Sequence, residues 1–419
     1  MTAQARSLIT AWKYSTSDYL LHVLPLHHIH GTINAILAPL FAGSTIEFLF
    51  PFNAHSVWHR FAAPFLPDPP TPRPSPITFF TVVPTVYNRL LATFTDLSPE
   101  NQTAAKTAIS PQHLRLNISG SAALPTPTKK AWNNLSSGNV LLERYGMTEV
   151  GMALSCSLPF SARVDGSVGW PLPGVEVRLV DTDTGAVIKE GEELDSEGRE
   201  RDGEIQLRGP TTFKEYWRNP EATKKEHVEG EDGRGRWFKT GDVAVRRIVP
   251  RSEENGIVSG HTERWDEGPM YFIRGRLSAD IIKSGGEKVS ALEVERELLS
   301  LPQIAEAAVV AVPSGKWGQK VGAVVILRDR AEEGRKGRWG AMDMRRALKE
   351  RLASYKIPQV MKVVESIPRN AMGKSKSIRS TLSPDIVCAM SRCKANWNTV
   401  NKKQLVKEVF QNEASGDEM

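Results

Sequence analysis

The sequence predicts an α/β protein with a largely parallel sheet, followed by a small α+β domain. Between residues 20 and 150, short apolar runs alternate with glycine- and proline-containing turns and helix-like segments, which is typical of a parallel sheet. Residues 166–249 change to short alternating strands with glycines between them, which indicates a β-rich subdomain. From about residue 277, a helix, two strands and a second helix follow, which is the content of a small separate domain.

The N-terminal part reads as helix, strand, helix and strand in that order. Residues 1–12 have an amphipathic helical pattern. Residues 20–26 and 44–50 are short apolar runs bounded by turn residues, and we expect strands there. Residues 32–41, between the two runs, are expected to form a helix.

The strands that follow end in turns rich in glycine and serine. Residues 77–83 read as a buried strand, and a helix is expected from Pro84. Residues 113–125 and 141–151 each run from a strand into a turn, with the sequences SGSA and YGMTE. Because ligands bind beyond the carboxyl ends of strands in such sheets, we expect the ligand site at these two turns.

The expected elements of the later parts are shorter. In the β-rich subdomain, strands are expected at residues 175–181, 203–209 and 239–247. The small domain is expected to contain a helix and a strand within residues 288–313, a strand at 321–328 and a helix that ends before Pro358.

Composition excludes several classes of protein. With 40% hydrophobic and 24% charged residues among 419, the chain is an ordinary globular one. Lys and Arg number 54 against 48 Asp and Glu, an excess that permits a local anion site and gives no argument for nucleic acid. No apolar run approaches the ~18–20 residues of a membrane span. Three cysteines exclude a disulfide framework and favour a reducing, intracellular compartment.

Six short motifs occur in a fixed order along the chain. They are LPLHHIHG at 24–31, SGSAALP at 119–125, ERYGMTEVG at 143–151, WFKTGDVA at 237–244, IRGRLSADIIKSGGEKVSALEVE at 273–295 and IPRNAMGK at 367–374. This series resembles the successive core motifs of the adenylate-forming (AMP-binding) acyl-CoA synthetase superfamily. One such motif alone would be weak support, and six in order are strong. Within the superfamily, the first and third most resemble malonyl-CoA synthetases.

The resemblance implies a large AMP-binding domain, residues 1–276, and a small mobile C-terminal domain, residues 277–374. Relatives carry a phosphate-binding loop of the form T-S-G-T-T-G-x-P-K-G before a helix like residues 2–12. That loop is not in this sequence, so the large domain is interpreted as N-terminally truncated. Residues 375–399 interrupt a segment that is continuous in relatives and are interpreted as an aberrant insert, such as a translated intron, before a tail at 400–419.

The activity that the resemblance implies has two steps. A carboxylate attacks the α-phosphate of ATP to give an acyl-adenylate and pyrophosphate, and the thiol of coenzyme A then displaces AMP. Both steps need positive charge and hydrogen-bond donors where oxyanion charge develops. Mg²⁺, held by few protein ligands, is expected to neutralise the phosphates.

The resemblance assigns residues to the nucleotide. Glu149 matches the carboxylate that binds Mg²⁺, Thr148 a hydroxyl near the phosphates, Asp242 the acceptor of the ribose hydroxyls and Arg276 an arginine near the ribose. From the residues alone, Thr148 and Glu149 could instead begin a helix, Asp242 could be a turn residue and Arg276 a surface residue. Further nucleotide contacts are expected at Ser119, Gly120, Ser121, Tyr145, Gly146 and Met147.

Two lysines match catalytic groups of the family. Lys374 matches the mobile lysine that bridges carboxylate and phosphate during adenylation, a role that suits a compact charge on a long stem. Lys283 matches a lysine that approaches the site for the thioester step. The hinge between the domains would lie at Leu277 and Ser278. Either lysine could instead be an ordinary solvated side chain.

Histidines 27, 28 and 30 could suggest zinc, but no second ligand cluster follows and Cys156 stands alone. The family resemblance places His28 at the gate between the acyl pocket and the pantetheine tunnel. His30 is expected near the acyl pocket.

Arg144 bears on the substrate. A buried unpaired charge is costly in a fatty acyl pocket, whereas a second carboxylate on the substrate would pair with the guanidinium. In malonyl-CoA synthetases the matching arginine is taken to bind that distal carboxylate, and Ser119 and Ser121 could add hydrogen bonds. The alternative is that Arg144 forms a structural pair with a glutamate across the sheet.

The expected function is therefore an ATP-dependent acid–CoA ligase that activates malonate or methylmalonate. Another acyl- or aryl-CoA ligase and an inactive truncated pseudoenzyme without the phosphate loop remain as alternatives. We expect a monomer that uses ATP, Mg²⁺ and coenzyme A, without nucleic acid or a membrane span. Cytoplasm, mitochondrion and peroxisome are not distinguished.

Overall fold

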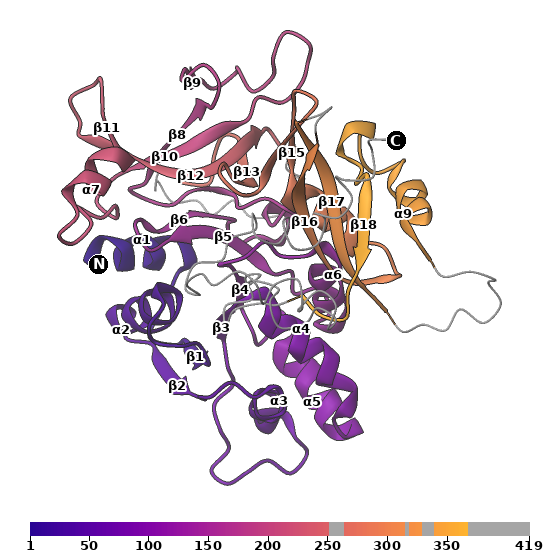
Figure 1. Ribbon diagram of the computed structural model, residues 1–419. Helices are drawn as coiled ribbons and strands as arrows, with labels where there is room; N and C mark the ends of the chain where they lie inside the picture. Colours follow the sequence, from indigo (N-terminus) through magenta and orange to yellow (C-terminus); the bar gives the residue numbers. More distant parts are fainter. Residues whose placement is uncertain (251–263, 315–317, 329–338, 368–419) are drawn as a thin grey trace. The chain divides into compact units, whose positions relative to one another are not determined.

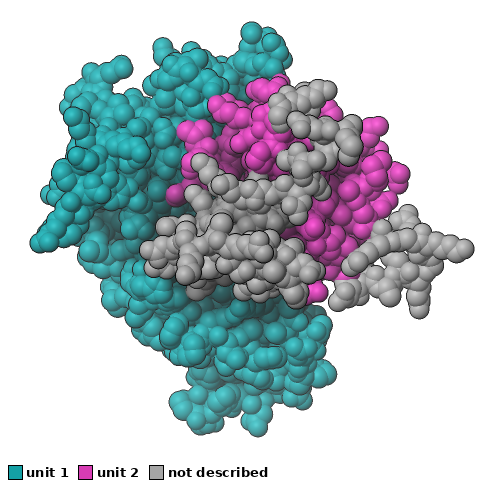
Figure 2. Space-filling model, viewed as in Figure 1, with its two compact units in different colours: residues 1–273 teal, residues 274–419 magenta. Residues whose placement is uncertain are grey.

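The computed structural model describes residues 1–250, 264–314, 318–328 and 339–367. The chain divides into two compact units, one of Met1–Ile273 and one that begins at Arg274, coloured teal and magenta in Figure 2. Lys374, the proposed insert and the C-terminal tail lie outside the described residues. The functional domain boundaries expected from the sequence stay a prediction.

The first unit contains a seven-stranded sheet in the order β2-β1-β3-β4-β5-β6-β7 (Figure 1). The first five strands of this order pair in parallel, and β6 and β7 are added antiparallel. The α/β fold with a parallel sheet is thus confirmed. The strands are β1 (Tyr19–His22), β2 (Thr45–Phe48), β3 (Phe79–Val82), β4 (Leu116–Ser119), β5 (Leu142–Met147), β6 (Gly151–Ser155) and β7 (Trp170–Pro171).

Helices connect and cover these parallel strands. Helix α1 buries Leu8 and Trp12, and the Trp12 indole donates to Ser155 Oγ at 2.9 Å. Asn53 and Ser98 cap α3 and α5 through their side chains. The helices are α1 (Thr2–Trp12), a π-helix (His30–Leu37), α2 (Ala38–Ala42), α3 (Ala54–Ala62), α4 (Pro84–Thr93), α5 (Pro99–Ile109) and α6 (Thr126–Leu135).

Two local features of this unit differ from what the residues alone suggest. The helix expected at residues 32–41 begins earlier, at His30, and its first part is a π-helix, a form frequent at functional sites. Residues 148–150 form the turn of a hairpin between β5 and β6. Thr148 and Glu149 therefore do not begin a helix.

The β-rich subdomain is a six-stranded sheet in the order β11-β12-β10-β8-β9, with β13 paired to β12. Leu179, Ile205, Leu207 and Phe238 form its buried centre. Strands occur at all three positions that the sequence predicts. The elements are β8 (Glu176–Asp181), β9 (Val187–Ile188), β10 (Gly203–Arg208), α7 (Pro220–Glu226), β11 (His227–Glu229), β12 (Arg236–Arg247) and β13 (Met270–Arg276).

The second unit has a five-stranded sheet in the order β15-β14-β17-β16, with β18 parallel to β17. Val294, Leu298, Met344 and Leu348 pack the two helices in its core. The last expected helix is shorter than predicted, because α9 ends at Leu348. The elements are β14 (Ile281–Ser284), β15 (Glu287–Ser290), α8 (Ala291–Leu299), β16 (Ile304–Ser314), β17 (Gly318–Leu327), α9 (Ala341–Leu348) and β18 (Val360–Val363).

Across both units, short 3₁₀ turns occur at Ala63–Phe65, Phe94–Asp96, Phe160–Ala162 and Ser354–Lys356. Among the described residues, no helix is long and apolar enough to cross a membrane.

A buried ion pair joins α6 to β5. Lys129 Nζ lies 2.8 Å from Glu143 Oε1, and these side chains are 8% and 7% exposed. Lys129 also donates to the carbonyl of Arg163 at 2.9 Å. Because successive side chains of a strand point to opposite faces, this pair holds β5 from the face opposite to Arg144.

Replacing Lys129 with methionine leaves the Glu143 carboxylate buried without this cation. Breaking a buried pair costs about 3–5 kcal/mol, so we expect Lys129→Met to lower the free energy of unfolding by about that amount in urea denaturation. Arg199→Met removes an exposed cation and is expected to leave the midpoint almost unchanged. A Lys129→Met protein as stable as the wild type would contradict the structural role of the pair.

Candidate active site

The candidate site lies at the carboxyl ends of the parallel strands. Thr81 is near the end of β3, and Ser119 ends β4. Arg144 is the third residue of β5 and directly follows the residues that pair in parallel with β4. The π-helix that follows β1 begins at His30. Because these strands run in parallel, their carboxyl ends meet at one edge of the sheet, as the sequence predicts.

The guanidinium of Arg144 is buried and incompletely paired. The residue is 4% exposed, its Nη2 donates to Ser121 Oγ at 3.4 Å, and its Nε has no hydrogen-bond partner. Burial lowers the pKa of this guanidinium to about 9. Among the described residues no carboxylate pairs with it, and the neighbouring Glu143 binds Lys129 instead. The alternative of a structural pair between Arg144 and a glutamate is therefore not observed among the described residues.

Gly120 leaves the space that this guanidinium occupies. A Cβ at position 120 would lie 2.5 Å from Cζ and Nε of Arg144, well inside van der Waals contact. Ser121, the next residue, has a left-handed φ of 67°, and its hydroxyl contacts Arg144. Glycine therefore suits position 120 of the SGSA turn, because the Arg144 guanidinium occupies the space that a Cβ would fill.

His30 is the other ionisable group beside Arg144. Its Nε2 lies 2.7 Å from Thr81 Oγ1, and its Nδ1 lies 3.3 Å from Ser121 Oγ. Burial, with the nearby positive charge of Arg144 as a further cause, holds the pKa of His30 well below its usual value. A neutral imidazole therefore faces the guanidinium, with Ser121 between them.

Thr81 is a functional candidate that the sequence did not single out. It is 2% exposed and contacts His30. The signal available in the sequence is a polar residue near the end of an apolar strand, at the edge where ligands bind.

The other histidines give no support for zinc. Among the described residues there is no group of three or more histidine, cysteine or acidic side chains able to hold a metal. His27 and His28 stack with ring centroids 4.2 Å apart. Cys156 is buried, and burial raises the pKa of its thiol to about 12, which makes it a packing residue.

A hydrogen bond links the YGMTE turn to the β-rich subdomain. Tyr145 Oη donates to Asp242 Oδ2 at 2.6 Å. Asp242 is 8% exposed, and its backbone N–H donates to Thr240 Oγ1 at 3.0 Å. Two of the predicted nucleotide residues, far apart in the sequence, are therefore brought together.

The remaining residues of this turn are placed by the hairpin. A Cβ on Gly146 would overlap with the carbonyl oxygen of Gly151. Met147 Sδ accepts a weak hydrogen bond from Tyr145 Oη at 3.9 Å. Thr148 is exposed, and Glu149 is half-buried. Ser119 is buried, and its hydroxyl has no hydrogen-bond partner among the described residues.

Glu149 has the chemistry of a magnesium ligand. One carboxylate oxygen, Oε1, accepts a hydrogen bond from Tyr216 Oη at 3.1 Å. For Oε2, the part of the chain that the structure describes offers no hydrogen bond and no cation. A single carboxylate suits Mg²⁺, which is commonly bound through one or two carboxylates together with phosphates and water.

Arg276 and Lys283 belong to the second unit. Arg276 ends β13 and is exposed, and its backbone N–H donates to Asp280 Oδ2 at 3.0 Å. Lys283 is an exposed residue of β14, and its backbone N–H donates to Gln319 Oε1 at 2.8 Å. Their roles, and that of Lys374, stay predictions.

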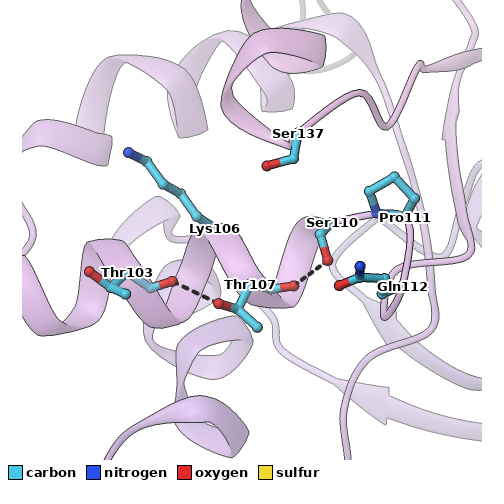
Figure 3. A pocket seen from close by; sticks show the side chains of 7 residues that line it. All are labelled: Thr103, Lys106, Thr107, Ser110, Pro111, Gln112 and Ser137. Carbon is cyan, nitrogen blue, oxygen red and sulfur yellow. Dashed lines mark hydrogen bonds between the residues drawn. The ribbon is translucent and has the colours of Figure 1, made fainter.

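A hollow of roughly 430 Å³ on the first unit is separate from these residues (Figure 3). Lys106, Thr107 and Ser110 line it, together with the segment after α5 and Ser137. The hydroxyls of Thr107 and Ser110 donate to backbone carbonyls of their own helix. The hollow contains no predicted site residue.

Comparison with known proteins identifies two matching families. Residues 1–217 match the AMP-binding enzyme family, and residues 293–374 match the AMP-binding enzyme C-terminal domain. The chain is 54% identical to a CoA ligase of Gibberella moniliformis (strain M3125 / FGSC 7600), over 98% of this chain and 65% of that protein. It is 40% identical to the mitochondrial malonate–CoA ligase ACSF3 of Mus musculus, over 98% and 61%.

A solved structure shows the same fold. The ATP-bound MatB from Rhodopseudomonas palustris matches with a TM-score of 0.66 and 31% identity, over 89% of this chain and 61% of that one. The chain therefore spans about three fifths of the length of such relatives.

The contact between Gly120 and Arg144 predicts the effect of an added methyl group. Gly120→Ala forces the guanidinium to move, and overpacking of this kind costs about 1–3 kcal/mol. We expect a lower free energy of unfolding in urea denaturation.

Arg144→Ala serves as the matched background, because it removes the atoms that the new methyl group meets. In that background Gly120→Ala should cost much less. An equal cost with and without the arginine would show that the turn backbone, and not the guanidinium, requires glycine.

Proposed function

This chain belongs to the AMP-binding enzyme family, and on that premise we propose that it activates malonate or methylmalonate with ATP and transfers the acyl group to coenzyme A. The observation that carries the proposal is the buried Arg144 guanidinium, which has no carboxylate partner among the described residues. A buried unpaired charge is unfavourable. A dicarboxylate substrate would supply the missing anion.

Recognition of the distal carboxylate is assigned to one cluster. Arg144 would pair with the carboxylate through two N–H groups, the geometry that guanidinium favours. Ser121 would add its hydroxyl, and neutral His30 would line the same side of the acyl pocket. His28 would stand where the pantetheine arm of coenzyme A enters. Acids without a second carboxylate would leave the guanidinium unpaired, which disfavours them.

The nucleotide is assigned to the two turns and to Asp242. The carboxylate of Asp242 would accept the ribose hydroxyls, with Tyr145 bonded to it at 2.6 Å. Arg276 would reach the same ribose. The SGSA turn and the YGMTE turn would contact the rest of the nucleotide through Ser119, Gly120, Ser121, Gly146, Met147 and Thr148.

The first chemical step joins the two ligands. An oxygen of the reacting carboxylate forms a bond to the α-phosphorus, the bond to the bridging oxygen of the β-phosphate breaks, and pyrophosphate leaves. Thr148 would donate to the phosphate oxygens, where charge develops. Lys374 would place its ammonium between the carboxylate and the α-phosphate. Mg²⁺, held by Glu149, would supply charge neutralisation for the phosphates.

The second step releases the product. The sulfur of coenzyme A bonds to the acyl carbon, the carbon–oxygen bond to AMP breaks, and the thiol proton is lost to solvent or a base. Lys283 would approach the site at this stage. Use of two different lysines in two steps requires that the small domain change its orientation, a device known in enzymes that reuse one active site.

The proposal is tested by pyrophosphate release from ATP with malonate, methylmalonate and acetate. We expect release with the two dicarboxylates and much less with acetate. Folded protein that releases no pyrophosphate with any acid would contradict the enzyme function. Equal rates with acetate and malonate would favour another acyl-CoA ligase.

Substitution of Arg144 separates specificity from activity. Losing one partner of a desolvated charge pair costs about 2–5 kcal/mol or more. Arg144→Ala should therefore lower kcat/KM for malonate by about 100-fold or more. The value for acetate should change little. Arg89→Ala, which removes an exposed arginine of α4, is the control. Unchanged malonate kinetics in Arg144→Ala would disprove the assignment.

A further inference from the structure

One segment of the β-rich subdomain holds Glu149 at two points. The backbone N–H of Phe213 donates to the carbonyl oxygen of Glu149 at 2.7 Å. The hydroxyl of Tyr216 donates to Glu149 Oε1 at 3.1 Å. Both the main chain and the side chain of the turn residue are therefore fixed by residues 213–216.

Tyr216 is itself firmly placed. Its backbone N–H donates to Thr223 Oγ1 at 2.9 Å, and the Thr223 hydroxyl donates to the carbonyl of Asn219 at 2.9 Å. Thr223 is 6% exposed. The rings of Tyr216 and Phe213 pack with centroids 4.7 Å apart, and Phe213 packs edge-on against Phe238 of β12. The hydroxyl of Tyr216 thus reaches Glu149 from a rigid support.

The two oxygens of the Glu149 carboxylate differ in their surroundings. Oε1 accepts the tyrosine hydroxyl, whereas Oε2 has no hydrogen bond and no cation among the residues that the structure describes. A carboxylate that ligates a metal is commonly oriented by a hydrogen bond to its other oxygen, and loss of such a partner typically lowers metal affinity or activity 10–100-fold. Tyr216 and Glu149 have this arrangement.

We propose that Tyr216 is a positioning residue that orients Glu149 so that Oε2 binds the Mg²⁺ carried by ATP. This inference rests on the proposed function, because it needs Glu149 to be the metal ligand. It adds a residue outside the six motifs, supplied by the β-rich subdomain to a turn of the parallel sheet. The metal site would then depend on the packing between these two parts of the first unit.

The test measures metal affinity in the full chain, with Mn²⁺ as the probe in the presence of ATP. Free Mn²⁺ is followed by electron paramagnetic resonance for the wild type, Tyr216→Phe, Glu149→Gln and the double variant. Tyr19→Phe is the matched control, since the Tyr19 hydroxyl has no hydrogen bond among the described residues. Thermal unfolding of each variant is recorded in parallel.

We expect Tyr216→Phe to weaken Mn²⁺ binding by about 10-fold or more, with Tyr19→Phe equal to the wild type. Glu149→Gln should weaken binding further, and adding Tyr216→Phe to it should have little additional effect, because the tyrosine acts through the carboxylate. A purely structural role would lower the unfolding temperature and leave the metal affinity of the folded protein unchanged.

Failure of the inference is distinguishable from failure of the proposed function. Wild-type affinity in Tyr216→Phe, together with weak binding in Glu149→Gln, would overturn the positioning role and leave the function intact. Wild-type affinity in Glu149→Gln, or no Mn²⁺ binding with ATP by the wild type, would overturn the metal assignment and the positioning role with it. If Tyr216→Phe does not fold, Tyr216→Leu also removes the hydroxyl that donates to Glu149, and its Mn²⁺ affinity decides in the same way.

Discussion

The Arg144 guanidinium brings a positive charge into a part of the protein that is almost closed to water, and the neighbouring residues accommodate that charge without neutralising it. Gly120 provides the space, and Ser121 provides one acceptor. His30 is kept neutral by burial and by the same charge. On the other face of β5, Lys129 forms an ion pair with the adjacent residue, Glu143. These contacts leave the arginine available to an anionic ligand.

The proposed nucleotide contacts depend on contact between the parallel sheet and the β-rich subdomain. The hairpin after Arg144 carries Tyr145 to Asp242 and Glu149 to Tyr216. A single strand, β5, therefore connects the proposed acyl pocket to the proposed phosphate and ribose contacts. This continuity fits the different roles that we propose for the residues of the ERYGMTEVG motif.

The sequence predicts the elements well where apolar periodicity and turn residues agree, as in the parallel strands and α1. It fails where three-dimensional context decides. Local propensity does not reveal the π form of the helix at His30 or the early end of α9 at Leu348. Thr148 and Glu149 are residue types typical of a helix N-terminus, yet they lie in the turn of the hairpin that β5 and β6 form. Tyr216 carries no local signal, because its role comes from a contact with a residue distant in sequence.

The central claim is that Arg144 binds the distal carboxylate of the substrate. The most direct measurement is a crystal structure of the protein with a hydrolysis-resistant analogue of malonyl-adenylate. Our account predicts that the distal carboxylate lies within about 3 Å of the Arg144 guanidinium, beside Ser121. A distal carboxylate that points to solvent, with Arg144 left unpaired or bound to a side chain of the protein, would contradict it.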